Sequence, residues 1–367
     1  MSNPCSKHLW ASVIATVAFM IAALPAQAQR FTRTDLTQNA TGVSTAASHT
    51  DAHMVNPWGM SRSSGGDWWL SDNTSGLSTL YDSNGVPQSL VVTIPPPAGS
   101  KATAAPSGTV YNYTNSFNVT PGWPSFFIFV TEDGTISGWN PGVSSTQALL
   151  IVDRSKVAEY KGCALATTAY GPRFFASNFK SGEVEVFDGN FHLLTFPAGS
   201  FSDPLIPADY VPFNIQNVGG HLVITFAFRT PGSHDESHGS GLGYVDIFDV
   251  NGRLLHRLVH GTYFNAPWGV AETPADFGAL SHRLLIGNFG DGTINIFDPS
   301  SGEWEGKMQN ASGAEIVIPG LWGLSFGNGA SAGSSTVLYY TAGPSDESQG
   351  LFGTLTPLST EQRGNSE

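Results

Sequence analysis

Charged residues are scarce in this sequence of 367 residues. Only 16 Lys and Arg and 29 Asp and Glu are present, so that 12% of the chain is charged, about half of the usual ~25%. Because the exposed faces of helices are rich in Glu, Lys and Arg, this scarcity argues against a helical protein. The net charge of −13 makes nucleic acid and anionic membrane surfaces poor partners.

Cysteine is almost absent, and one of the two copies stands in an N-terminal segment that is typical of a signal peptide. Lys7 precedes an apolar run over residues 10–24, and Ala26-Gln27-Ala28 forms a small-x-small cleavage site. We predict cleavage after residue 28 and export to the periplasm or the medium. The loss of Cys5 leaves Cys163 alone, without an intramolecular disulfide and, in an apolar stretch, as a buried inert thiol.

No stretch of the sequence is long enough for a membrane span. The apolar run of the signal segment is about 15 residues long, whereas a spanning helix needs ~20. No later segment is as apolar. We therefore expect no membrane span after signal cleavage.

Glycine and proline, in contrast, are abundant, with 42 and 23 copies. They recur in a repeated unit of the sequence. The unit begins with an aromatic residue and Gly, continues with an apolar segment typical of a β-strand and ends with a second such segment. Trp58 and Trp268 open the two clearest copies and Trp322 opens the last, weaker one, and Trp58 and Trp322 lie five steps of about 53 residues apart. This spacing is typical of β-propeller blades, which have four strands each.

The repeat predicts an all-β, six-bladed β-propeller, although five or seven blades remain open at the weaker copies. Alternating residues in 183–187 and 293–297 indicate strands with one buried face. The last copy lacks an outer strand, and residues 31–37 belong to no other unit, so we expect this N-terminal strand to pair with the last blade and close the ring. Residues 29–358 then form a single domain, followed by a disordered C-terminal tail over 359–367.

Five segments carry a resemblance to known proteins: residues 56–59, 132–141, 288–292, 320–324 and 340–344. In them the chain resembles an uncharacterised family of exported, mainly bacterial β-propeller proteins, some of which carry PEP-CTERM sorting tails. Residues 361–367 do not resemble such a tail, so the resemblance does not lead us to expect surface anchoring by that route. The units are more distantly similar to NHL and lactonase-type propellers. The resemblance implies the fold and no particular activity.

The propeller topology predicts where a functional site would lie. The loops between the second and third strands of each blade, the B–C loops, all leave the ring on one face, and loops on a rigid scaffold commonly carry function. The six B–C loops are residues 72–76, 132–134, 178–182, 229–243, 288–292 and 342–350.

The fourth B–C loop is the longest and holds two imidazoles and two carboxylates. These side chains, His234, Asp235, Glu236 and His238, suit a divalent cation, with the nitrogen donors favouring Zn²⁺ and the carboxylates alone Ca²⁺. The alternative is a hydrated polar loop without a ligand.

A second hypothesis places a cation in the central channel, held by side chains from several blades as the resemblance to calcium-dependent lactonase-like propellers implies. The channel-face candidates are Asp72, Asn73, Glu132, Asp133, Asn178, Asn214, Asn288 and Asp291. Asp346 and Glu347 are further acidic residues of these loops. The alternative is that Asp and Asn beside Gly cap their own turns.

The sequence favours a monomeric binding module for a small molecule, glycan or protein on the loop face, because it holds no compact catalytic motif. The alternative is a metal-dependent hydrolase, lactonase-like, or a lyase, with Ca²⁺ or Zn²⁺ in the channel. Whether the protein is an enzyme stays open at this point.

Overall fold

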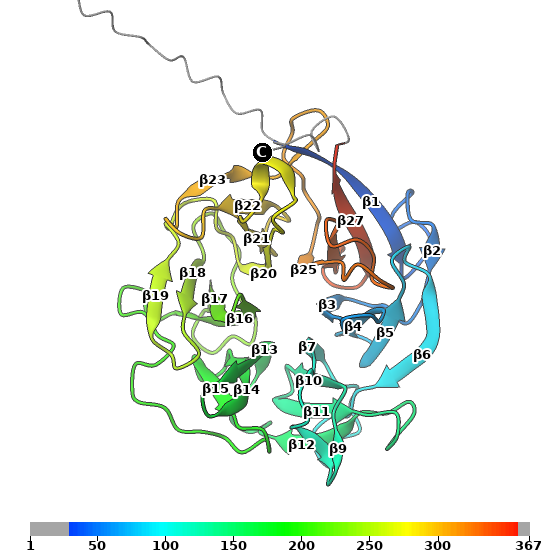
Figure 1. Ribbon diagram of the computed structural model, residues 1–367, viewed down its shortest axis with the longest axis vertical. Coiled ribbons are helices and arrows are strands. Elements are labelled where there is room, and N and C mark those ends of the chain that lie inside the picture. Colours follow the sequence, from blue (N-terminus) through cyan, green and yellow to red (C-terminus); the bar gives the residue numbers. More distant parts are fainter. Residues whose placement is uncertain (1–28, 359–367) are drawn as a thin grey trace, which may run out of the picture.

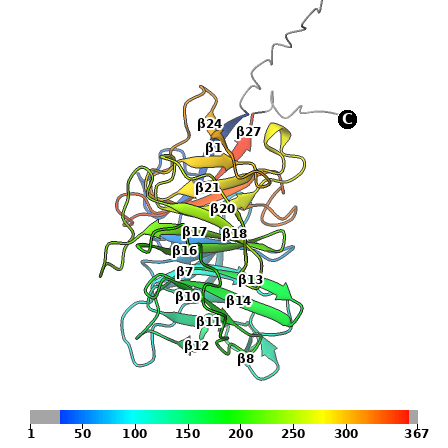
Figure 2. The ribbon, with the colours of Figure 1, turned by 90° about the vertical axis from the view of Figure 1, so that its left-hand side faces the viewer.

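The computed structural model describes residues 29–358. The predicted signal peptide and C-terminal tail lie outside these described residues. Within them the chain forms six β-sheets arranged as blades around a central axis (Figure 1), which confirms the predicted six-bladed β-propeller. Seen from its edge, the ring has the blade that contains residues 106–153 at the bottom and the blade that contains residues 321–357 at the top (Figure 2).

Each blade begins at the central axis and proceeds outward along the chain. Blade 1 holds β3 (Pro57–Ser61), β4 (Trp68–Asp72), β5 (Leu77–Tyr81) and β6 (Pro87–Thr93). Blade 2 holds β7 (Pro106–Tyr111), β10 (Phe127–Thr131), β11 (Thr135–Trp139) and β12 (Leu149–Asp153), with the hairpin β8 (Asn118–Thr120) and β9 (Trp123–Pro124) inserted. Blade 3 holds β13 (Tyr160–Thr168), β14 (Gly171–Asn178) and β15 (Glu183–Phe187).

The second half of the ring follows the same plan. Blade 4 holds β16 (Tyr210–Val218), β17 (His221–Phe228), β18 (Tyr244–Phe248) and β19 (Leu254–Arg257). Blade 5 holds β20 (Pro267–Glu272), the short 3-10 helix η1 (Gly278–Leu280), β21 (Leu284–Asn288), β22 (Ile294–Phe297) and β23 (Trp304–Lys307). Blade 6 holds β25 (Leu321–Phe326), β26 (Leu338–Ala342) and β27 (Leu351–Pro357), and β24 (Gln309–Asn310) precedes it.

Turn chemistry and close packing explain why these segments fold as blades. Asp82 accepts backbone hydrogen bonds from Asn84 and Val86 in the turn between β5 and β6, and Gly85 has a φ of +77° there, in the left-handed region that favours glycine. Near the axis the inner strands approach so closely that a Cβ at Gly59 would lie 2.8 Å from the carbonyl oxygen of Ser107 on β7. The glycine after the blade-opening tryptophan therefore allows the inner strands to converge.

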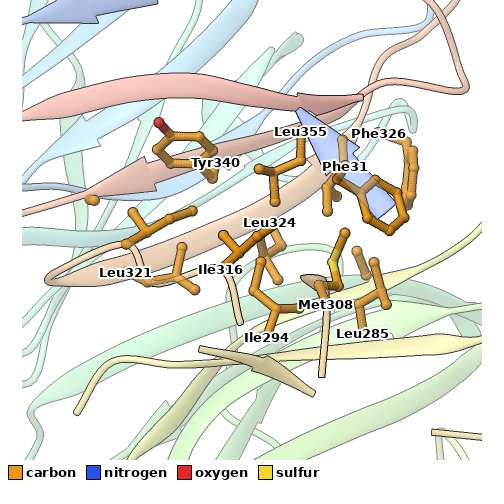
Figure 3. Close-up of a cluster of buried hydrophobic side chains, with 14 of the residues drawn as sticks. Phe31, Leu285, Ile294, Met308, Ile316, Leu321, Leu324, Phe326, Tyr340 and Leu355 are labelled. Atoms are coloured by element: carbon orange, nitrogen blue, oxygen red, sulfur yellow. The ribbon is translucent and has the colours of Figure 1, made fainter. Parts of the chain in front are cut away.

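The ring is closed by the N-terminal strand, as predicted. Strand β1 (Arg30–Gln38) pairs antiparallel with β27 and becomes the outer strand of blade 6, and β2 (His49–Thr50) and β24 flank it in parallel. Phe31 on β1 is fully buried and packs with Met308, Phe326 and Leu355 in the cluster between blades 5 and 6 (Figure 3). The closing strand is thus held in two ways: by hydrogen bonds across the sheet and by burial of its side chains in the apolar core that blades 5 and 6 share.

A polar network fastens the closing strand. Arg33 donates hydrogen bonds to both carboxylate oxygens of Asp35, at 2.7 and 3.1 Å, and the hydroxyls of Ser44 and Tyr340 donate to the same carboxylate. Burial would raise the pKa of Asp35, but these hydrogen bonds and the charge of Arg33 hold the pKa below its usual value. Asp35 therefore joins β1 to β26 in its charged form.

Replacing Asp35 with alanine should lower the free energy of unfolding by about 2 kcal/mol, because the buried hydroxyl of Tyr340 loses its acceptor and Arg33 loses its carboxylate. Urea denaturation at pH 7 measures the loss. The exposed Asp276, on the loop between β20 and β21, provides a control, because its replacement with alanine should cost less than ~0.5 kcal/mol. Equal stability of the two variants would contradict the assigned role of Asp35.

Blade 3 departs from the expected four strands. After β15 a single bridge joins Phe187 to Leu193, and the chain then turns away through a hydrogen bond from the Ser200 amide to the Pro197 carbonyl. Proline cannot donate to a ladder, so the run that began at Leu193 ends there. The outer edge of this blade is a loop.

Cys163 on β13 is buried and free, as the sequence predicts. Burial raises the pKa of its thiol, so the thiolate is suppressed. Across residues 29–358, no helix has the length and apolar character needed to traverse a bilayer.

Candidate functional site

A cavity of about 290 Å³ lies on the B–C loop face, at the mouth of the central channel. All six blades contribute to its lining, through strand starts and B–C loops. The lining residues are Trp58, Glu132, Lys161, Asp235, Glu236, His238, Phe289, Asp346 and Glu347. We call this cavity the channel mouth.

Aromatic rings close the channel beneath this cavity. Trp58 stacks on Trp322 with ring centroids 3.7 Å apart, Trp322 stacks on Phe289 at 3.9 Å, and Trp268 meets both tryptophans edge-on. The three tryptophans are buried, and they pack against one another across the channel. Deeper in the channel only about 20 Å³ of space remains beside Trp268.

Lys161, at the start of β13, is the central charge of the site. Its side chain is 1% exposed, and its ammonium forms ion pairs with Glu132 and, at 3.2 Å, with Glu159. The same ammonium lies over the rings of Trp58 and Phe179, 5.4 and 5.2 Å from their centroids. Burial would lower the pKa of Lys161, but the charges of Glu132, Glu236 and Glu159 outweigh burial and raise it, so the amine stays protonated.

Two asparagines position the surrounding carboxylates. Asn73 donates to Glu132 at 2.7 Å, and Asn56 donates to Glu347 at 3.2 Å while accepting from the indole of Trp322. Burial, followed by the negative charges of Glu236 and Glu132, raises the pKa of Glu347 to about 7, against the opposing influence of Lys161 and Asn56. Glu347 therefore exchanges its proton near neutral pH.

The segment that carries Glu347 is strained. Ser345, Asp346 and Glu347 have consecutive φ angles of +57°, +49° and +62°, in the left-handed region that costs a non-glycine residue roughly 1–2 kcal/mol each. Hydrogen bonds hold the turn, among them one from the amide of Glu347 to the carbonyl of Gly343. Strain of this kind clusters at functional sites, which agrees with the position of Asp346 and Glu347 in the cavity wall.

The fourth B–C loop places three of its four predicted ligands in the cavity wall: Asp235, Glu236 and His238. His238 Nε2 lies 3.3 Å from Glu236, and this contact raises the pKa of His238. His234 is instead turned to Glu159, 2.7 Å away. No group of three or more His, Cys, Asp or Glu side chains within residues 29–358 is arranged to hold a metal ion, and Zn²⁺ or Ca²⁺ binding stays a prediction.

Of the eight channel-face candidates, Glu132 lines the channel mouth and Asn73 holds it in place, as described above. The other six bond within their own blade or to its neighbours. Asp72 is fully buried and accepts from the hydroxyl of Thr79, and burial raises its pKa well above the usual range. Asp133 and Asp291 accept from the backbone amides of Ala105 and Thr293.

The three remaining asparagines of that set also satisfy backbone groups. Asn178 accepts from the amide of Glu159, Asn214 donates to the carbonyl of Trp268, and Asn288 accepts from the amide of Asn265. These bonds reach residues 19, 54 and 23 positions away and so lie outside the turns of the three asparagines, whereas Asn178 also accepts from the amide of Ser181 in its own turn, as the turn-making alternative expects. The three longer-range bonds join neighbouring segments on the B–C loop face of the ring and so make the surroundings of the channel mouth rigid.

Four residues of the site had not been predicted: Lys161, Glu159, Asn56 and Phe289. One signal was present in the sequence, since Lys161 occupies the start of an inner strand, where Trp58 and Trp268 stand in other blades. Glu159 precedes it by two residues, so both project to the same side of the chain. Asn56 and Phe289 lie within the segments 56–59 and 288–292, but their contacts come from neighbouring blades and are remote in sequence.

Comparisons with known proteins give relatives of unknown function. No protein-family model matches the chain. Uncharacterized protein R648 of Acanthamoeba polyphaga mimivirus is 31% identical over 319 residues, covering 84% of this chain and 76% of that protein. Uncharacterized protein L690 of the same virus is 30% identical over 322 residues, covering 84% and 82%.

Solved structures with a related chain path have low sequence identity and modest structural agreement. A streptogramin B lyase has a TM-score of 0.48 at 10% identity and covers 89% of this chain and 97% of its own. Virginiamycin B lyase from Staphylococcus aureus has a TM-score of 0.47 at 11% identity, with 90% and 100% covered. The sequence relatives, and not the solved structures, show the family. The chain belongs to the same protein family as R648 and L690 of the mimivirus.

Proposed function

We propose that this protein is a ligand-binding β-propeller that holds a small molecule in the channel mouth, and that it acts after export. The observation that carries the proposal is the cavity of about 290 Å³ to which all six blades contribute. Its size is at the lower end of the range for small-molecule sites, ~300–1,000 Å³. A small molecule therefore fits it better than a glycan chain or a protein surface does.

The site is also organised in advance of any ligand. Lys161 is fixed by two carboxylates and two rings, while Asn73 and Asn56 orient Glu132 and Glu347. Holding the lining in place before binding reduces the entropy that a ligand must overcome. This rigidity supports recognition of one kind of compound.

A thermal-shift screen of metabolites tests the proposal. We expect compounds that raise the Tm of the native protein to lose their effect when Asp235 is replaced with arginine, because a long side chain then fills the channel mouth. Asp276→Arg, on the opposite face, is the matched control and should respond like the native protein. Stabilisation that survives in Asp235→Arg, or a screen in which no compound separates the two variants, would contradict the proposal.

The second candidate function is a hydrolase or lyase. The observation in its favour is the pKa of Glu347, about 7, because a general acid or base works best near the operating pH. Turnover that is lost in Glu347→Gln while the substrate still binds would establish it. Its metal-dependent form further requires that Ca²⁺, Zn²⁺ or Mn²⁺ raise the Tm.

A further inference from the structure

The lining of the channel mouth is unbalanced in charge. Five carboxylates, from Glu132, Asp235, Glu236, Asp346 and Glu347, face a single lysine and one histidine. A concave surface dominated by one sign of charge attracts ligands of the opposite sign. Charge alone, however, does not identify a ligand. The ligand class depends on which lining side chains already have a hydrogen-bond or ion-pair partner and which do not.

The lysine is not available to a ligand. Lys161 already forms ion pairs with Glu132 and Glu159 and lies over two aromatic rings. Its side chain is 1% exposed. An anionic ligand would therefore have to displace a buried carboxylate from this amine, which makes an acidic ligand a poor fit.

Three of the carboxylates, in contrast, form no ion pair within residues 29–358, although the charge of Lys161 lowers the pKa of Glu347 from a distance. Asp235 and Asp346 are exposed at the rim, and Glu347 receives only the amide hydrogen bond of Asn56. The fourth, Glu236, is paired with His238. The channel mouth thus offers acceptors without matching donors, and a protonated amine supplies up to three N–H donors together with a positive charge.

The wall beside these carboxylates is apolar and aromatic. Phe289 and Trp58 line the cavity, and Trp58 already accommodates the ammonium of Lys161 over its ring. Aromatic walls suit the methylene groups of an alkylamine and attract its charge. A bare metal ion would leave this wall unused, and the carboxylates are not grouped to coordinate one.

We propose that the ligand of the channel mouth is a small organic amine in its protonated form, bound by Glu347, Asp346 and Asp235 against the aromatic wall of Phe289 and Trp58. This inference rests on the proposed function, because it names the chemical class of the ligand for the same cavity. The carboxylates of Glu132 and Glu236, the ammonium of Lys161 and the imidazole of His238 also border the cavity and set the field around the bound amine. Binding should weaken as salt screens these charges.

Isothermal titration calorimetry at pH 8 tests the inference with n-butylamine and 1,5-diaminopentane as probes. The diamine has two matched competitors of the same chain length, 1,5-pentanediol as the neutral one and glutarate as the acidic one. We expect at least one amine to bind, and the double variant Asp346→Asn with Glu347→Gln to weaken it at least tenfold. Both replacements keep the side-chain size, and circular dichroism checks that the variant folds. Asp276→Asn should leave the affinity unchanged.

The outcomes separate this inference from the proposed function. If no amine binds, if the diol or glutarate binds as tightly, or if the double variant keeps its affinity, the amine inference is wrong. The proposed function survives these results when a compound of another class binds and loses its affinity in Asp235→Arg. Both fail when no compound depends on the channel mouth.

Discussion

Replacing Lys161 with methionine should lower the free energy of unfolding by about 3–5 kcal/mol, the range found when one partner of a buried ion pair is removed. Methionine fills much of the same volume, so a cavity contributes little to the loss. The cost arises because Glu159, whose side chain is 7% exposed, and Glu132 keep their negative charges without the ammonium that neutralises them. Urea denaturation of the purified protein at pH 7.5 measures it.

A compensated variant distinguishes charge from packing. When Glu132→Gln and Glu159→Gln are added to Lys161→Met, the buried charges are removed together, and most of the lost stability should return. If the triple variant is as unstable as Lys161→Met, the loss comes from packing of the lysine stem and the assigned electrostatic role is wrong. A stability change below ~1 kcal/mol in the single variant would contradict the role as well.

Lys161 also shows where prediction from sequence ends. Lysine is seldom buried, and nothing in residues 160–166 signals that this one is neutralised by Glu132 from blade 2 and stands over Trp58 from blade 1 as well as over Phe179 of its own blade. Glu132 and Trp58 belong to other blades and meet Lys161 only in the assembled ring. A repeat predicts where each strand begins, but not which unusual residue will be used at one of the six equivalent positions.

The overall architecture, in contrast, was predictable from local features. The spacing of Trp58, Trp268 and Trp322 predicted six units, and the leftover segment 31–37 predicted closure, because both are properties of the repeat itself. The face of the site was predictable too, since the topology alone places all B–C loops together. Blade 3 was the exception, where Pro197 ends the pairing after a single bridge.

The chemistry of the individual carboxylates was not predictable, because burial differs among residues with the same sequence context. Asp72 and Asp291 both stand near the end of a second strand beside a B–C loop. The structure makes Asp72 a fully buried group whose pKa is raised well above its usual value by burial, and Asp291 a turn cap that accepts from Thr293. The sequence could assign both to the channel face, but only the packing decides which charge persists.

Asp246 on β18 should make the protein less stable as the pH rises. It is 2% exposed and lies in register with Arg257 on β19, which donates to Asp203. Burial, followed by the charge and hydrogen bond of Asp203, raises the pKa of Asp246 to about 8. Consistent with a protonated carboxyl, no protein donor reaches its Oδ2 atom, and the neutral acid donates to Asp203 instead.

The sign of the effect follows from proton linkage. Between the unfolded pKa of 3.8 and the folded pKa of about 8, the folded state binds more protons than the unfolded state, so the free energy of unfolding falls as the pH rises. Glu347, with its pKa of about 7, contributes in the same direction up to that pH. The decrease in the free energy of unfolding between pH 7 and pH 8 is therefore caused mainly by Asp246.

Replacing Asp246 with asparagine should flatten this profile and stabilise the protein by up to about 6 kcal/mol at pH 9 relative to the native chain, since the pKa of Asp246 rises from 3.8 to about 8 and each unit corresponds to ~1.4 kcal/mol. The amide keeps a donor for Asp203 but has no charge to bury. Urea denaturation at pH 5, 7 and 9 measures the difference, with Asp276→Asn as the control for a lost surface charge. Parallel pH profiles for Asp246→Asn and the native protein would show that Asp246 is already ionised at pH 5, because only a carboxyl that gives up its proton between pH 5 and 9 can separate the two curves.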